Sequence, residues 1–212
     1  AATMALADSG LEITEGIGEK TADVHLLRSH AYSGLEQYEK AARALALAEQ
    51  EARDAENDSF FRPDYYLYLA TLCENLGYID RMVEAARNAR ERAPDDPVVA
   101  NFLGYVLADH NRDLAEAETL ILEAVQAEPR NVAYLDSLAW VYYRQGRHSA
   151  ALEQINLCLR LSGRDPDPVI LDHAGDIYRE NAMLLLARRY WWDALTADQK
   201  PGDAAEIRRK LE

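Results

Sequence analysis

Cysteine is scarce in this sequence, and long apolar runs are missing altogether. Cys73 and Cys158 stand far apart, each within an apolar helical stretch, so we expect two core thiols rather than a disulfide or a metal site. No stretch approaches the roughly 20 apolar residues of a membrane-spanning helix. The opening residues, AATMALADSG, lack the basic and then apolar order of a signal peptide. Direct membrane insertion is therefore not expected.

Basic residues are also in deficit. The chain has 23 Lys and Arg against 37 Asp and Glu, a formal net charge of −14. A surface of this sign repels phosphate backbones and anionic lipid headgroups. Nucleic acids are therefore not expected as partners.

Metal-binding and phosphate-binding motifs are missing as well. The five histidines, His25, His30, His110, His148 and His173, include no pair at i, i+4. The segment Gly16-Ile17-Gly18-Glu19-Lys20 has the wrong spacing for a P-loop and no strand before it. We expect neither a metal nor a cofactor.

What the sequence does contain is helix-forming residues, mainly Ala, Leu, Glu and Arg, in a repeating pattern. If the repeats are taken to begin at Lys20, Pro63, Pro97, Val132 and Pro168, successive starts are 43, 34, 35 and 36 residues apart. Each interval reads as an apolar-periodic helix, a polar turn, a second Ala-rich helix and a Pro or Gly break. The chain is therefore predicted to be all-α, with about five helical hairpins at 20–62 (degenerate), 63–96, 97–131, 132–167 and 168–201.

Small and bulky residues recur at fixed places in these hairpins. In the first helix the seventh residue is usually large and the eighth usually small, as in Leu103-Gly104 and Leu138-Ala139; the first repeat has Leu26-Leu27. The second helix repeats a set of anchors, Ala41, Met82, Ala117, Ala151 and Ala187. Four residues later comes a bulky side chain, except at Ala86, and seven residues later Ala or Cys. Gly34, Gly77 and Gly146 are predicted to lie in the turns between paired helices.

This pattern resembles the tetratricopeptide repeat (TPR). The residues that carry the resemblance are Leu103-Gly104, Leu138-Ala139 with Tyr142, and Gly175 with Tyr178. Residues 101–109 and 135–146 look most like bacterial TPR proteins. The resemblance covers about residues 20–201 and implies a right-handed superhelical α-solenoid of antiparallel helix pairs. The first repeat departs from it, since His30 replaces the usual Tyr. Residues 1–19 are expected to form a remnant helix and a joint, and 202–212 a capping helix opened by Asp203 and Glu206.

The fold implies a concave surface lined by the first helices, and therefore protein binding rather than catalysis. The helical register places polar and aromatic side chains there. Trp140 and Tyr105 are of the kind found in interaction hot spots, and the acids beside them favour a basic partner. The alternative is that Trp140 packs between repeats and the acids form a solvated face. The predicted groove residues are Asn101, Tyr105, Asp109, Asp136, Trp140, Tyr143, Arg144, Asp172, Asp176 and Arg179.

Two other kinds of site would use the same acidic residues. Asp136, Asp172 and Asp176 would repel a carboxylate, so the carboxylate clamp known from this fold is not expected. Asp172 and Asp176 share a helix face but are expected to lack the enclosing pocket of a catalytic pair. The run Tyr190-Trp191-Trp192 offers either end-capping core or a homo-oligomer contact.

The primary hypothesis is a non-catalytic scaffold that binds a peptide or protein segment, and we expect that segment to be basic. The alternative is the regulatory or positioning array of a larger enzyme or of a bacterial envelope-assembly protein. The chain opens without an initiator Met and ends in Leu-Glu, a common cloning residue, so we expect a fragment. The compartment stays open between bacterial cytoplasm and periplasm.

Overall fold

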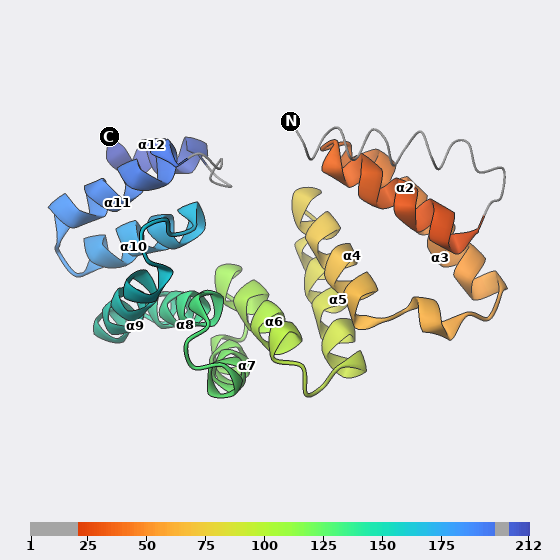
Figure 1. Cartoon of the computed structure of the whole chain (residues 1–212), viewed down its shortest axis with the longest axis horizontal. Coiled ribbons are helices and arrows are strands. Elements are labelled where there is room, and N and C mark those ends of the chain that lie inside the picture. Colours follow the sequence, from red (N-terminus) through yellow and green to blue (C-terminus); the bar gives the residue numbers. More distant parts are fainter. Residues whose placement is uncertain (1–20, 198–203) are drawn as a thin grey trace. The chain divides into compact units, whose positions relative to one another are not determined.

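The computed structural model describes residues 21–197 and 204–212, and within these ranges the chain forms helices and no strand. The predicted all-α class of paired helices is confirmed (Figure 1). The helices are α2 (Ala22–Gly34), α3 (Tyr38–Asp54), α4 (Pro63–Asn75), α5 (Ile79–Arg92), α6 (Pro97–Asp109), α7 (Leu114–Ala127), α8 (Val132–Arg144), α9 (His148–Ser162), α10 (Pro168–Glu180), α11 (Leu184–Thr196) and α12 (Ala204–Leu211), with a short 3₁₀ helix η1 (Asp58–Phe60).

The helices belong to two compact units, the first ending at Ala93 and the second beginning at Pro94. In each unit the first helix of a hairpin packs most closely on the helix that follows it, so that α2 pairs with α3, α4 with α5, α6 with α7, α8 with α9 and α10 with α11. The candidate site described below lies wholly in the second unit.

In four hairpins the first helix begins at the predicted start of the repeat, namely at Pro63, Pro97, Val132 and Pro168. Proline is well placed at a helix start, because its missing N–H would have no partner in the helix. The side chains of the preceding Asp96, Asn131 and Asp167 accept hydrogen bonds from main-chain N–H groups of the first turn.

The contact between paired helices is built from the small and bulky residues that recur in the sequence. The five anchors are buried, and Ala48, Ala89, Ala124, Cys158 and Ala194, seven residues later, are fully buried. A Cβ at Gly104 would lie 2.7 Å from Ile121 Cγ1, and one at Gly175 would overlap the Trp191 ring. Small residues on one helix therefore admit the bulky residues of the other.

The paired helices are joined by turns that each use a left-handed residue at the same place. These residues are Glu36, Gly77, Asn111, Gly146 and Ala182, with φ between 53° and 73°. Gly34, predicted to lie in a turn, is instead the last residue of α2. The α6–α7 turn is one residue longer, and a second left-handed residue, Asp113, precedes α7 there.

The first hairpin is two residues out of the predicted register. Leu27, assigned to the small position, is 55% exposed, whereas Ser29 is fully buried and its hydroxyl donates to the Ala41 carbonyl at 2.8 Å. Counting from Ala22, Ser29 matches Ala139 and Gly175, and Tyr32 matches Tyr142 and Tyr178. The usual Tyr is therefore Tyr32, and the prediction that His30 replaces it is wrong.

The C-terminal helix α12 follows the repeat spacing, since it begins 36 residues after Pro168. Its Ile207 takes the place of Leu135 and Leu171 in this register and is 1% exposed, in the core of the second unit. The helix lies in the segment predicted to cap the array and packs on α11. The remnant helix and joint expected at 1–19, and the capping residue Asp203, lie outside the described residues.

Candidate functional site: the first-helix face of the second unit

Nine of the ten residues predicted to line a groove form one network of ring contacts, hydrogen bonds and ion pairs, either directly or through His173 and Lys210. They lie on α6, α8 and α10, and we call the surface they form the first-helix face. Asn101 is not connected, and its buried Oδ1 has no hydrogen-bond partner. The connected residues are Tyr105, Asp109, Asp136, Trp140, Tyr143, Arg144, Asp172, Asp176 and Arg179.

Three stacked rings form the centre of this face. The Trp140 ring stacks on His173, with centroids 4.0 Å apart, and on Tyr143, at 4.8 Å. The indole Nε1 of Trp140 donates a hydrogen bond to Asp109 at 3.0 Å. The Arg144 guanidinium lies 5.7 Å from the Trp140 centroid. These contacts hold the Trp140 ring in one orientation.

Asp136 forms a buried pair with His173, the ring at one end of the stack. His173 Nδ1 lies 3.0 Å from Asp136 Oδ2 and 3.1 Å from Oδ1. Burial lowers the pKa of His173, but the Asp136 carboxylate, and then those of Asp172 and Asp109, outweigh burial, so that the pKa is raised. The imidazole is thereby favoured in its charged form against Asp136.

Asp172 and Asp176 share one cation, the ammonium of Lys210 on α12. Lys210 Nζ lies 2.8 Å from Asp172 Oδ1 and 2.8 Å from Asp176 Oδ2. Burial raises the pKa of Asp172 despite Lys210, and the two carboxylates outweigh burial to raise the pKa of Lys210. Arg179 adds a longer contact to Asp176, at 4.0 Å, and its Nη2 lies 3.5 Å from the Tyr143 hydroxyl.

Several of these residues were expected outside the core, and that expectation is wrong for Asp136, Trp140 and Asp176, which are 6%, 7% and 5% exposed. The physical reason is side-by-side packing of first helices: α8 lies against α6 and α10, and α12 brings Lys210 to α10. The accessible part of the face consists of half-buried side chains, among them Tyr105, Tyr143, Arg144, Asp172 and Arg179.

Two members of this network, His173 and Lys210, were missed by the sequence reasoning. His173 stands between Asp172 and Asp176 on one turn, which was a usable signal for an internal partner. Lys210 was missed because no repeat start was predicted after Pro168. One more repeat of 36 residues would begin at Ala204, where α12 begins, and Lys210 of α12 contacts Asp172 of α10.

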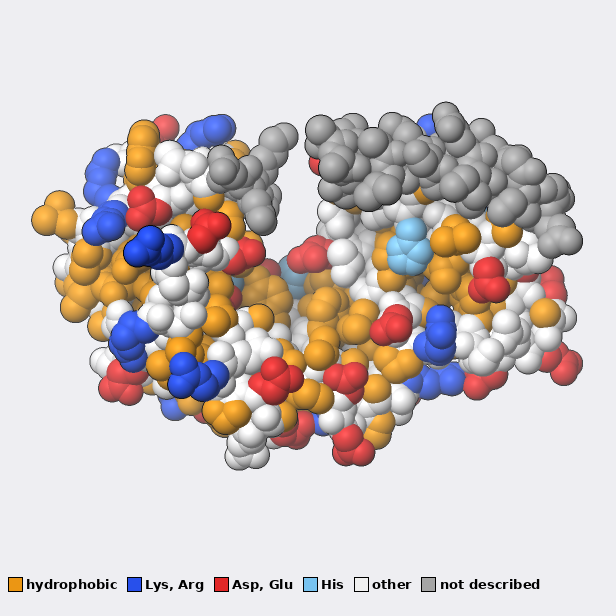
Figure 2. Space-filling model, viewed as in Figure 1, with side chains coloured by type: hydrophobic (Ala, Val, Ile, Leu, Met, Phe, Trp, Pro, Cys, Tyr) orange, Lys and Arg blue, Asp and Glu red, His pale blue; other side chains and the backbone are white. Residues whose placement is uncertain are grey.

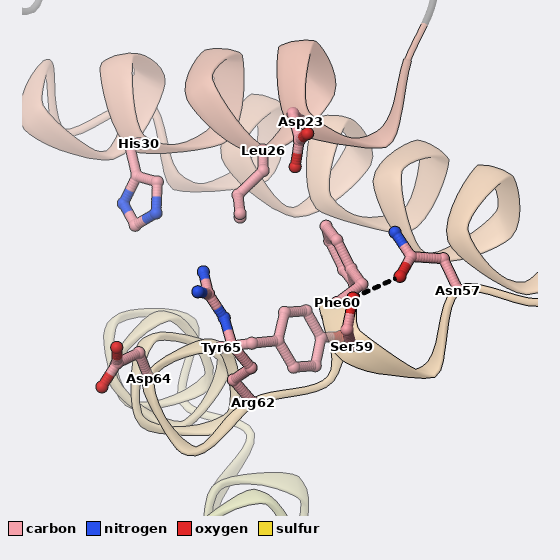
Figure 3. A pocket seen from close by; sticks show the side chains of 9 residues that line it. All are labelled: Asp23, Leu26, His30, Asn57, Ser59, Phe60, Arg62, Asp64 and Tyr65. Carbon is pink, nitrogen blue, oxygen red and sulfur yellow. Dashed lines mark hydrogen bonds between the residues drawn. The ribbon is translucent and has the colours of Figure 1, made fainter.

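A separate cleft lies in the first unit, between α2 and the α3–α4 connection (Figure 3). It has a volume of about 400 Å³, and Phe60 and Tyr65, both buried, are part of its apolar lining. Burial lowers the pKa of His30, which keeps its imidazole neutral near neutral pH. The cleft has the size of a small ligand or side-chain pocket but mixes both signs of charge. Its lining residues are Asp23, Leu26, His30, Asn57, Ser59, Phe60, Arg62, Asp64 and Tyr65.

Within 21–197 and 204–212, no three His, Cys, Asp or Glu side chains are grouped so as to hold a metal ion. None of the helices described is long and apolar enough to cross a membrane. Both cysteines are buried, as predicted, and burial raises the pKa of Cys158 to about 12.

Comparison with known proteins identifies the family. No family model matches the chain. Over 153 residues, 72% of its length, it is 31% identical to the TPR repeat-containing protein PA4667 of Pseudomonas aeruginosa. This chain is a TPR protein, similar to bacterial members of that family. The match spans 24% of that relative, about a quarter of its length. TPR proteins are generally non-catalytic scaffolds for protein–protein interaction.

Solved structures share the fold of this TPR chain. A thermophilic TPR protein of Thermus thermophilus superposes with a TM-score of 0.65 at 20% identity, covering 90% of this chain and 96% of its own. Desulfovibrio magneticus MamA gives 0.62 at 18%, covering 93% and 99%. Pseudomonas aeruginosa PilF gives 0.61 at 19%, covering 90% and 86%. These likenesses support the fold and leave the partner open.

Proposed function

We propose that the first-helix face of the second unit binds a polypeptide segment of another protein. The observation that carries the proposal is the stacked column of Tyr143, Trp140 and His173, flanked by half-buried Tyr105 and Arg179. Tyrosine and arginine are enriched among the residues that dominate binding energy at protein interfaces.

The buried ion pairs act as a support for these accessible groups. Trp140 is fixed by Asp109 and His173, and Arg179 is held near the Tyr143 hydroxyl. Side chains that are already ordered lose less conformational entropy when a partner binds. The face therefore offers rigid rings and the Arg179 guanidinium without needing to rearrange.

The proposal does not depend on the charge of the partner. The sequence predicts a basic partner from Asp136, Asp172 and Asp176. In the structure these carboxylates face His173 and Lys210. A basic partner stays a prediction, whereas the proposal itself depends on the rings and on Arg179.

Selection from a random peptide library displayed on phage tests the proposal. Among peptides that bind the wild-type chain, Tyr143→Ala and Arg179→Ala should each weaken affinity about tenfold. Arg160→Ala, which removes an exposed arginine from α9, is the matched control and should leave affinity unchanged. Equal affinities for all three variants, with unchanged circular dichroism, would remove the face as the binding site. The Lys and Arg content of the selected peptides tests the prediction of a basic partner.

A second candidate is a positioning array within a longer protein. It is favoured by the match to PA4667, in which the corresponding stretch makes up only 24% of the length. Sequencing the full reading frame of this chain tests it, because an adjoining catalytic or envelope-assembly domain is required.

A further inference from the structure

An exposed apolar surface lies on α11 and on the residue before it, and α11 is not one of the helices that form the first-helix face. Leu185 is 87% exposed, Leu184 and Trp192 61%, Met183 42% and Leu186 41%. We call these five residues the α11 patch. In Figure 2 hydrophobic side chains protrude where α11 begins, with Lys and Arg side chains beside them.

The equivalent positions of the other second helices show that the repeat fold does not require this patch. The place of Leu185 is taken by Glu39, Asp80, Ala115 and Ser149, and that of Leu186 by Lys40, Arg81, Glu116 and Ala150. Exposed polar or small residues are what a solvated helix face needs. Leu185 and Leu186 therefore need another explanation, and apolar patches on a monomer commonly mark interaction sites.

The charge around the α11 patch is opposite to that of the chain. α11 and α12 carry Arg188, Arg189, Arg208, Arg209 and Lys210 against two acids, Asp193 and Glu206, while the whole chain has a net charge of −14. Asp172 and Asp176 hold Lys210, and Glu206 pairs with Arg209. Arg189 has Asp193 at 3.5 Å.

Among the described residues neither Arg208 nor Arg188 forms an ion pair, and of the two it is Arg188 that lies on α11, beside the α11 patch. It is exposed and lies one turn from both Leu184 and Trp192, so that these three residues follow one stripe of α11. Apolar groups at both ends of a basic centre complement a helix that presents apolar anchors around a carboxylate.

We propose that the α11 patch docks an acidic amphipathic helix of a partner protein. A second copy of the chain fits less well, because a symmetric contact would bring Arg188 and Arg189 against their own copies. An anionic membrane surface fits less well, because the charge of the whole chain opposes it.

The test uses a short synthetic helix with leucines at i, i+4 and i+7 and glutamates elsewhere, and a twin with lysines in place of the glutamates. Trp140 and Trp191 are buried, so Trp192 is the exposed fluorophore among the three tryptophans. The acidic helix should shift the Trp192 emission to the blue and bind at least about tenfold more tightly than the basic twin.

Leu185→Glu should weaken the acidic helix about tenfold or more, whereas Leu47→Glu, at an exposed leucine of α3, should not. Arg188→Ala should reduce the preference for the acidic helix over its twin. Equal binding of the two helices, or equal binding to Leu185→Glu and wild type, would overturn the proposal. Binding of the chain to phosphatidylglycerol vesicles would also overturn it, if Leu185→Glu abolished that binding. The same holds for a rise in mass with concentration, measured by light scattering, if Leu185→Glu abolished the rise.

Discussion

His173 and Asp136 form a buried ion pair across two neighbouring first helices, 3.0 Å apart at their closest atoms. Asp136→Asn leaves the imidazole buried without its charged partner. Breaking a buried pair from one side typically costs about 3 kcal/mol or more. Urea unfolding should show a loss of about that size. A change below about 0.5 kcal/mol would mean that the pair does not stabilise the fold.

The same pair gives the stability of the fold a dependence on pH. Because the pKa of His173 is raised in the folded state, its stabilising effect is complete below the unfolded value of about 6.5 and is lost as pH rises through the folded pKa. The free energy of unfolding of the wild type should therefore fall relative to that of His173→Gln over this range. Parallel curves for the two proteins would contradict the assignment. Urea titrations at a series of pH values give the comparison.

Lys210 should hold α12 in place. Lys210→Met leaves Asp172 and Asp176 close together without their cation, so amide hydrogen exchange in α12 should become faster. The pKa of Asp172 is already raised, and its protonation relieves the repulsion. The effect of the substitution should therefore shrink as pH falls. Arg208→Met, at an exposed position of the same helix, should leave exchange unchanged.

Gly175 should be intolerant of any side chain. A Cβ there overlaps the Trp191 ring, so Gly175→Ala should lower the free energy of unfolding by about 2 kcal/mol. Trp191→Leu removes the overlapping ring. The double variant should therefore be more stable than the sum of the two single losses predicts. Strict additivity in thermal or urea unfolding would show that the two residues do not constrain each other.

The register of the first hairpin can be tested with one pair of variants. Ser29→Leu forces a large side chain against the Ala41 carbonyl and should destabilise the chain by about 2 kcal/mol. Leu27→Ala, at an exposed position, should change stability by less than about 0.5 kcal/mol. The opposite order would support the register predicted from the sequence.

The sequence predicted most of the fold because its signals are local. The start of a first helix needs Pro or a capping residue, and the helix contact needs a small residue, so both leave fixed spacings. The first hairpin was misplaced because Ser29 takes the place of Ala or Gly through a hydrogen bond, which a pattern of residue size does not reveal. The longer α3–α4 connection then hid the two-residue shift.

The sequence predicted which side chains lie together on the first-helix face but not how deeply they are buried; their role in binding stays a prediction. Helical periodicity brings Asp109, Asp136, Trp140 and Asp176 to one face, as the structure shows. Their burial depends on how closely neighbouring first helices approach, and on His173 and Lys210 as internal partners. Such pairings join residues 31 to 38 positions apart and leave no periodic trace.

The register of α12 also has an energetic consequence for the α10–α11 hairpin beside it. In a fold stabilised by nearest neighbours, a hairpin with a neighbour on one side opens first, and unfolding propagates inward from it. With eight residues, α12 gives the α10–α11 hairpin a neighbour on its second side. Asp172, His173 and Asp176 therefore gain the cooperativity of an interior repeat.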